Sequence, residues 1–267
     1  MSAANDLNRP PALTQFAHVV VGIDGSAEAL EAARQAARLT DGELTLLAAY
    51  DPAETVVGGT AIGVPVYADG ERLRAETDEA LRAAAASIAD AGATAQVARG
   101  RGWDALLEEV EREGASLVAV GSHGNGRFAG VVLGSTATEL VHKAPCSVLV
   151  AREAGADFPT RIAVGVDGSA ESAAAYATAK ALVDRFGASL WPVVAHGSGA
   201  VDRDAVERIV GDRREDSPHD AVTALLGSST EADLLVVGSR GLHGLRALGS
   251  VSERIAHRAR CSVLVVR

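Results

Sequence analysis

Short apolar runs alternate with longer stretches of helical periodicity along the first part of the chain. Runs such as His18–Ile23 are apolar throughout, which is typical of strands buried on both faces of a parallel sheet. The expected strands are 18–23, 44–50, 94–98, 117–120 and 147–150, and the expected helices are 27–39, 71–90, 103–113 and 135–143. Strands that alternate with helices predict an α/β domain of three layers with right-handed crossovers.

The same pattern of strands and helices is repeated in the second half of the chain. Val20–Glu28 aligns with Ala163–Glu171 at an offset of 143 residues, whereas two later segments align at offsets of 117 and 115. The second copy has therefore lost 26 residues in its middle and two more near its end. We expect a first domain at 18–152, a linker at 153–160 and an abbreviated second domain at 161–267.

In the second copy, 161–166 and 190–195 repeat the first two strands, and we expect the third strand at 206–210. The missing residues fall between His196 and that third strand. We therefore expect one face of this sheet to be thinly covered, with the first copy or a second molecule packed against it.

Charge and composition exclude some partners. The net charge is −10 and the pI is about 5.2, without a basic run, which argues against binding to nucleic acid or to an anionic membrane. No 18 apolar residues run together and no signal-peptide pattern opens the chain, so we expect a soluble, cytoplasmic protein. Only two cysteines occur, so a disulfide framework is not the source of stability.

A glycine-rich loop joins the expected strand at 117–120 to the expected helix at 135–143. Glycine backbone can approach an anion closely, and the N–H groups at a helix start face it, so this loop suits phosphate. The P-loop motif is absent, and a dinucleotide-like match at 124–129 lies after the wrong strand, without the acidic residue that should follow it.

The spacing of this loop is specific. Gly121 and Gly124 are followed after nine residues by Gly134 and Ser135, and Asp24 closes the first strand. This pattern resembles the nucleotide-binding branch of the universal stress proteins, over nearly the whole chain. The resemblance implies two tandem domains, each with a five-stranded parallel sheet flanked by helices, in an adenine nucleotide alpha hydrolase-like, Rossmann-like fold. It also implies binding of ATP, ADP or AMP, with Mg2+.

The resemblance assigns roles to the first copy. Asp24 would accept hydrogen bonds from the adenine or ribose side, the backbone of Ala49 would meet the adenine edge, and Gly22 would let the ligand approach. Glycines around the loop would give conformational freedom, Arg127 would neutralise phosphate charge, and the helix start would donate N–H and hydroxyl groups. The loop residues assigned to nucleotide are Gly121, Ser122, His123, Gly124, Asn125, Gly126, Arg127, Gly134, Ser135 and Thr136.

The second copy departs from this pattern. Seven residues rather than nine separate its last two motif glycines, so its loop cannot follow the same path around a triphosphate. Its corresponding residues are Gly165, Asp167, Gly238, Gly241, Gly249 and Ser250. We expect this second site to be weakened, selective for a smaller ligand, or empty.

Several of these residues can also have purely structural roles. The loop glycines can be turn glycines, and Asp24 and Asp167 can each serve the following helix as a cap or turn residue. Two pairs of the form His-x3-Cys, ending at Cys146 and Cys261, offer too few ligands for a metal site, and we expect structural roles for them.

These observations favour a nucleotide-binding sensor or regulator of the stress response. A slow ATPase is one alternative, although no catalytic residues are evident. A nucleotide-free scaffold is the other: the short apolar strands at 148–150 and 263–266 are candidate edge strands. In related proteins such edges form dimers, so we expect a pseudo-dimer within the chain and a homodimer.

Overall fold

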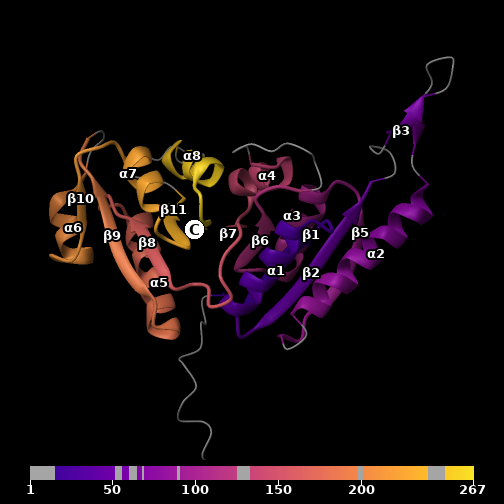
Figure 1. The fold of residues 1–267 in the computed structure, drawn as a ribbon, viewed down its shortest axis with the longest axis horizontal. Helices are drawn as coiled ribbons and strands as arrows, with labels where there is room; N and C mark the ends of the chain where they lie inside the picture. Colours follow the sequence, from indigo (N-terminus) through magenta and orange to yellow (C-terminus); the bar gives the residue numbers. More distant parts are fainter. Residues whose placement is uncertain are drawn as a thin grey trace, which may run out of the picture. The chain divides into compact units, whose positions relative to one another are not determined.

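The computed structural model describes residues 16–51, 56–59, 65–67, 69–88, 91–124, 133–197, 201–239 and 250–267. The chain divides into two compact units, 18–153 and the unit that contains 154–267 (Figure 1). Each unit has a parallel sheet flanked by helices, which confirms the expected α/β class.

In the 18–153 unit the sheet has the strand order β7-β6-β1-β2-β5, and all neighbouring strands are parallel. Its strands are β1 (His18–Ile23), β2 (Glu43–Tyr50), β5 (Thr94–Arg99), β6 (Leu117–Gly121) and β7 (Ser147–Ala151). Its helices are α1 (Ala27–Leu39), α2 (Gly70–Ser87), α3 (Gly102–Glu113) and α4 (Ser135–Lys143). The apolar runs are buried because helices cover both faces of these strands.

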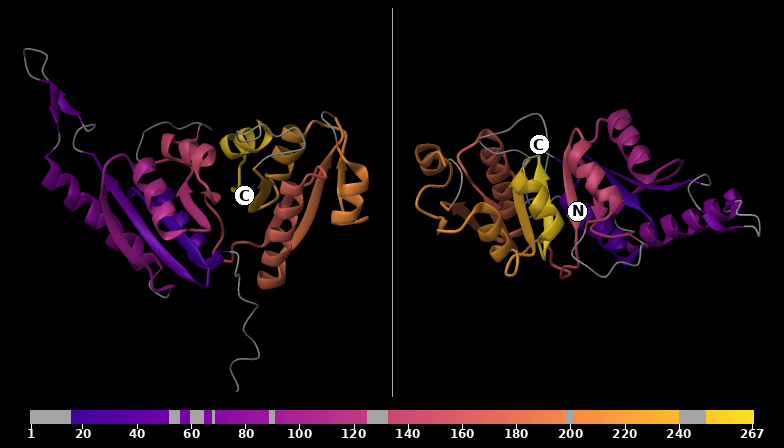
Figure 2. Two further views of the ribbon diagram at one scale, coloured as in Figure 1. Left: turned by 180° about the vertical axis from the view of Figure 1, so that it is seen from behind. Right: turned by 90° about the horizontal axis from the view of Figure 1, so that it is seen from above.

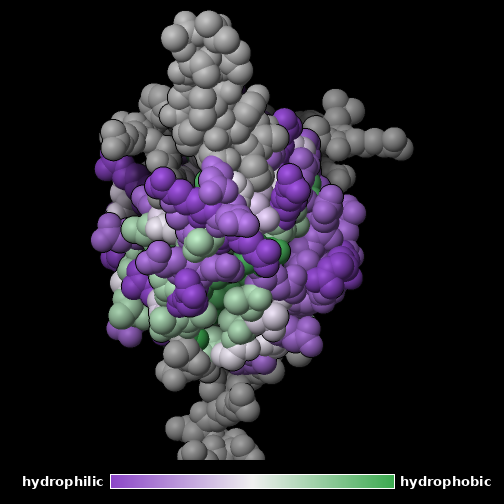
Figure 3. Space-filling model, turned by 90° about the vertical axis from the view of Figure 1, so that its right-hand side faces the viewer, coloured by the Kyte–Doolittle hydropathy of each residue, from purple (hydrophilic) through white to green (hydrophobic). Residues whose placement is uncertain are grey.

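Helices pair on the two faces of this sheet: α1 packs beside α2, and α3 packs beside α4. Figure 2 shows helices on both sides of the strands in this unit. The side formed by α2 and the edge strand β5 is mainly hydrophilic, with apolar residues interspersed (Figure 3). This surface follows from the sequence of α2, in which Leu81 and Ala84 are the buried residues.

One segment of the first copy is more regular than expected. We assigned no strand between the expected strand at 44–50 and the expected helix at 71–90, but part of this segment forms an antiparallel hairpin of β3 (Val56–Gly59) and β4 (Pro65–Tyr67). The two strands project from the unit in Figure 1. Strands of three or four residues carry too little periodic pattern to be separated from a loop in the sequence.

The other unit repeats the sheet with the order β10-β9-β8-β11-β12, again parallel throughout. Its strands are β8 (Arg161–Gly165), β9 (Ser189–Ala195), β10 (Glu215–Ser217), β11 (Leu234–Gly238) and β12 (Ser262–Val266). Its helices are α5 (Ala170–Phe186), α6 (Arg203–Val210), α7 (Ala221–Ser228) and α8 (Ser250–Arg258).

Our prediction of a strand at 206–210 is wrong. Those residues end α6, and the third strand of the second copy is β10. Asp202 caps α6 by accepting a hydrogen bond from the backbone N–H of Ala205 at 2.9 Å, which starts a helix where we read a strand. With 8 residues against the 18 of α2, α6 covers its sheet more thinly than α2 covers the first.

Both cysteines, Cys146 and Cys261, are free and buried. Among the helices of the described residues, none is long and apolar enough to cross a membrane.

Candidate functional site

The carboxyl end of β1 carries Asp24, the acidic residue of the motif. Its Oδ1 accepts hydrogen bonds from the backbone N–H and the hydroxyl of Ser26, at 2.9 and 2.6 Å. The Ser26 hydroxyl oxygen in turn accepts from Ala29 N at 3.1 Å, so it caps α1. One carboxylate oxygen therefore supports the first turn of the helix, as expected for a cap or turn residue.

The second carboxylate oxygen of Asp24 lies against the glycine loop. A Cβ placed on Gly124 would collide with Asp24 Oδ2, so the Asp24 carboxylate would have to turn away if residue 124 carried a side chain. Both residues are exposed. The structure thus brings together the strand-one aspartate and the second motif glycine, which lie 100 residues apart in the sequence.

The loop returns to its own beginning before α4 starts. Ser122 donates its N–H to Ala151 O in β7 at 2.9 Å, and its carbonyl accepts from Gly134 N at 2.9 Å. The Ser122 hydroxyl also contacts His123 Nδ1 at 3.0 Å. These bonds hold the start of α4 next to the end of β6. The predicted loop residues Asn125, Gly126 and Arg127 lie outside the described residues.

The start of α4 has no side-chain cap. Gly134 is its N-cap residue and makes no side-chain capping bond, so Ser135 and Thr136 begin the helix without one. The start of α3, at Arg101 and Gly102, also has no side-chain cap. The two starts are adjacent, because a Cβ on Gly102 would lie 3.6 Å from Thr136 Oγ1.

These two helix starts differ from the rest. Every other described helix with a described N-cap has an acceptor side chain there: Ser26, Asp69, Ser169, Asp202 and Asp220. Uncapped helix starts leave N–H groups and the positive end of the helix dipole available to an anion. We predicted both helices from the sequence but assigned a ligand role only to the start of α4, although the absence of Ser, Thr, Asp or Asn directly before Gly102 indicated an uncapped start for α3 as well.

The reason for two of the glycines is different from the one expected. Neither Gly121 nor Gly124 is among the described glycines with positive φ, so conformational freedom does not explain them. At Gly121 a Cβ would lie 2.7 Å from the backbone carbon of Glu28 in the first turn of α1. Gly121 is therefore required for close packing of a strand against a helix.

Gly22 also serves packing. A Cβ there would stand 2.8 Å from Leu106 Cδ1 and 3.0 Å from Val120 Cγ1, so α3 fills the space on that side of the backbone. Ala49 lies one residue before the end of β2, opposite Ala98 of β5, at the same edge of the sheet as Asp24. The roles of Gly22 and Ala49 toward a nucleotide stay predictions.

The second copy reproduces the hydrogen bonds of the strand-one aspartate and the close contacts of the neighbouring glycines. Asp167 Oδ1 accepts from the N–H and hydroxyl of Ser169 at 2.9 and 2.6 Å, as Asp24 does from Ser26. Gly238 packs against Glu171 as Gly121 packs against Glu28, with a Cβ position 2.8 Å from a backbone carbon. Gly165 likewise faces Leu225, at 3.1 Å.

The surroundings of Asp167 nevertheless differ from those of Asp24. Asp202, at the start of α6, donates its N–H to Asp167 O at 3.1 Å, and its own carbonyl oxygen lies 2.7 Å from a Cβ position on Gly168. Asp167 and Gly168 are half-buried, whereas Asp24 and Gly25 are exposed. The start of α6, which belongs to the shortened segment of the second copy, therefore covers the turn at Asp167 and Gly168. The corresponding turn of the first copy, at Asp24 and Gly25, is exposed.

The helix starts of the second unit are also less available. Asp220 caps α7, the counterpart of α3, and accepts from the N–H groups of Val222 and Thr223 at 3.1 and 3.2 Å. A hydrogen bond from the Thr223 hydroxyl lowers the pKa of Asp220, so this cap stays ionised. Gly241 and Gly249 lie outside the described residues; Ser250 begins α8, but its side chain is not described.

The chain resembles known proteins over most of its length. It matches the model of the universal stress protein family at residues 15–152 and 198–267. Universal stress protein Rv2623 of Mycobacterium tuberculosis is 30% identical over 292 residues, which cover 93% of this chain and 96% of that protein. Universal stress protein Rv2005c of the same organism is 35% identical over 191 residues, covering 60% of this chain and 64% of that relative, which is less than two thirds of its length.

A solved structure gives the same fold. The crystal structure of a universal stress protein from Archaeoglobus fulgidus matches with a TM-score of 0.69 and 22% identity, over 96% of this chain and 98% of that one. The family match, the tandem relative and the two α/β units agree. This chain belongs to the universal stress protein family.

Proposed function

We propose that the 18–153 unit binds one adenine nucleotide, ATP or its products ADP and AMP, with Mg2+, and that the protein acts as a regulator whose conformation or partner affinity depends on that nucleotide. The observation that carries this proposal is that two helix starts without side-chain caps, those of α3 and α4, lie next to each other and beside the exposed carboxylate of Asp24.

The chemistry of the site divides naturally between the two ends of a nucleotide. Uncapped helix starts attract phosphate through free N–H groups and the helix dipole. A carboxylate repels phosphate but accepts hydrogen bonds from ribose hydroxyl groups, so Asp24 belongs on the sugar side. Adenine rather than another base is what the family motif implies.

The proposal assigns no equivalent site to the second copy. The start of α6 lies on the Asp167–Gly168 turn, and Asp220 already satisfies the N–H groups that begin α7. A nucleotide in the same pose would have to displace Asp202 and compete with an ionised cap. We therefore propose one nucleotide per chain.

Two matched variants test the assignment. Asp24→Asn and Asp167→Asn change the same kind of carboxylate, because each bonds a serine N–H and hydroxyl at the same distances. Structural effects on the two helix caps should therefore be similar. A hydrogen bond to a charged group contributes about 1.5–3 kcal/mol, so Asp24→Asn should weaken ATP binding by roughly 10- to 150-fold.

Isothermal titration calorimetry on the nucleotide-stripped chain would measure both. We expect Asp167→Asn to bind ATP like the wild type. Equal losses in the two variants, or no loss in Asp24→Asn, would contradict the assignment. Failure of the wild type to bind any adenine nucleotide would favour the nucleotide-free scaffold, and phosphate release abolished by Asp24→Asn would add ATP hydrolysis to the proposed function.

A further inference from the structure

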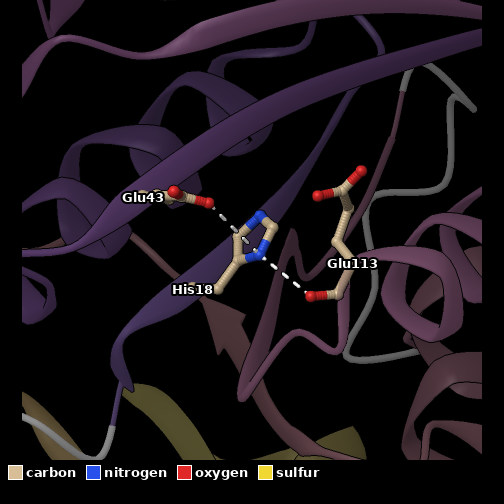
Figure 4. Close-up of side chains that lie close together, drawn as sticks. All are labelled: His18, Glu43 and Glu113. Carbon is tan, nitrogen blue, oxygen red and sulfur yellow. Dashed lines mark hydrogen bonds and ion pairs between the residues drawn. The ribbon is translucent and has the colours of Figure 1, made fainter.

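Three metal-ligating side chains meet at the amino-terminal edge of the sheet in the 18–153 unit, at the opposite ends of the strands from Asp24. His18 begins β1, Glu43 begins β2 and Glu113 ends α3. One ligand atom from each lies within 4.8 Å of the other two (Figure 4). Within the described residues, no other set of His, Cys, Asp and Glu side chains converges in this way.

The imidazole of His18 is held with one nitrogen toward the two glutamates. Its Nδ1 lies 3.8 Å from Glu43 Oε2 and 3.3 Å from the backbone oxygen of Glu113, while Nε2 lies 3.4 Å from the Thr45 hydroxyl. A histidine that binds a metal through one nitrogen usually donates its other N–H to an acceptor, which fixes the ring. Thr45, which is buried, can take that role.

The same atoms also explain a metal-free state. There, Nδ1–H donates to the Glu113 carbonyl, and Nε2 accepts from the Thr45 hydroxyl. For His18, binding a metal therefore requires a change of tautomer, while the ring keeps its position.

The distances are close to those of a metal site. Zn2+ holds nitrogen and oxygen ligands at about 2.0–2.2 Å, so tetrahedral ligands stand about 3.4 Å from one another. The 3.8 Å between His18 Nδ1 and Glu43 Oε2 is a small step from that value, and the Glu43 side chain is 81% exposed and can move.

Glu113 must also turn toward the metal, and its ion-pair partner permits this. Its carboxylate pairs with Arg112, which also binds Glu109 through Nε at 3.1 Å and a second nitrogen at 2.6 Å. Arg112 therefore keeps a carboxylate partner when Glu113 turns toward a metal.

We propose that this cluster binds one divalent transition-metal ion of the Zn2+ type through His18 Nδ1 and the carboxylates of Glu43 and Glu113, with water in the remaining position. One imidazole and two carboxylates are ligands that Zn2+ accepts in proteins. The bound ion joins the beginnings of two strands to the end of a helix, and therefore stabilises the 18–153 unit.

The second copy provides an internal comparison. In the β8–β9 pair, Arg161 stands opposite Ser189, at the place where His18 stands opposite Glu43 in the β1–β2 pair. A guanidinium and a hydroxyl do not replace an imidazole and a carboxylate as ligands. The proposal therefore predicts one metal ion per chain.

The test is a titration of the untagged, metal-free full-length chain with Zn2+ by calorimetry, together with thermal denaturation with and without the ion. We expect one ion per chain at this cluster, a higher denaturation temperature with Zn2+, and reversal by a chelator. Glu43→Gln and Glu113→Gln should each weaken binding at least tenfold. The control is Glu111→Gln, which removes an exposed acid from the same helix and should leave Zn2+ binding unchanged.

The outcome does not depend on a variant that fails to fold, because Glu43 is exposed at the start of its strand. Absence of Zn2+ binding to the wild type would overturn the proposal. Binding that survives unchanged in Glu43→Gln and Glu113→Gln would also overturn it, since the ion would then lie elsewhere.

Discussion

Replacing Gly121 by alanine tests whether this glycine serves packing. An added Cβ would lie 2.7 Å from both the backbone carbon and the Cβ of Glu28, and 3.0 Å from Ala29 N. These atoms belong to the first turn of α1, and Gly121, the last residue of β6, is held in register opposite Ala151 of β7. Neither side can yield without moving a backbone.

The expected magnitude follows from overpacking. Forcing a methyl group into a filled site costs about 1–3 kcal/mol, so Gly121→Ala should lower the free energy of unfolding of the 18–153 unit by that amount. Gly102→Ala is the matched control: its Cβ would meet nothing closer than Thr136 Oγ1 at 3.6 Å, and it begins a helix. Alanine there should leave stability unchanged or raise it by up to about 1 kcal/mol.

Fluorescence can report this unit alone. The chain has two tryptophans, and Trp103 lies in α3 whereas Trp191 lies in β9 of the other unit. Urea denaturation in a Trp191→Phe background therefore follows the 18–153 unit through Trp103. If Gly121→Ala were as stable as Gly102→Ala, the packing role of Gly121 would be refuted.

Three further predictions concern stability. Asp220→Ala removes the α7 cap and should cost about 1 kcal/mol in urea denaturation; no change would contradict the cap. Leu106→Ala empties a buried position and should cost about 2–5 kcal/mol; a loss below about 1 kcal/mol would count against this packing. A hydrogen bond from His196, with help from Arg214, lowers the pKa of Asp216 below 3.8. Its stabilising contribution is complete above pH 3.8 and disappears as the pH falls through the lowered pKa, so Asp216→Asn should flatten the acid side of the stability profile, and an unchanged profile would exclude this contribution.

The alternation of apolar runs and helical stretches was enough to predict the sheet of the first copy. It failed at α6, because Val206–Val210 has apolar residues at both ends of two charged ones, and five residues are too few for this pattern to separate a strand from one face of a helix. Asp202 was the signal that favoured a helix, since an acceptor side chain precedes the first helical residues. The hairpin of β3 and β4 was missed for a related reason, because strands this short carry little pattern.

The position of the site could be predicted from the sequence, but the contacts that require its individual residues could not. The motif placed Asp24 near the loop, and the structure brings it against Gly124. The partner of Gly121 is a helix turn almost 100 residues earlier in the chain, which sequence spacing does not reveal. The convergence of His18 with Glu43 and Glu113 depends on strand order in the same way.

The number of nucleotides bound per chain shows directly whether only one of the two copies binds a nucleotide. Equilibrium dialysis of the nucleotide-stripped protein against labelled ATP with Mg2+ gives this number without assuming any site. We predict one ATP per chain, because Asp24 lies beside uncapped helix starts while the start of α6 lies on the turn of Asp167. Two equivalent sites, or none, would contradict it.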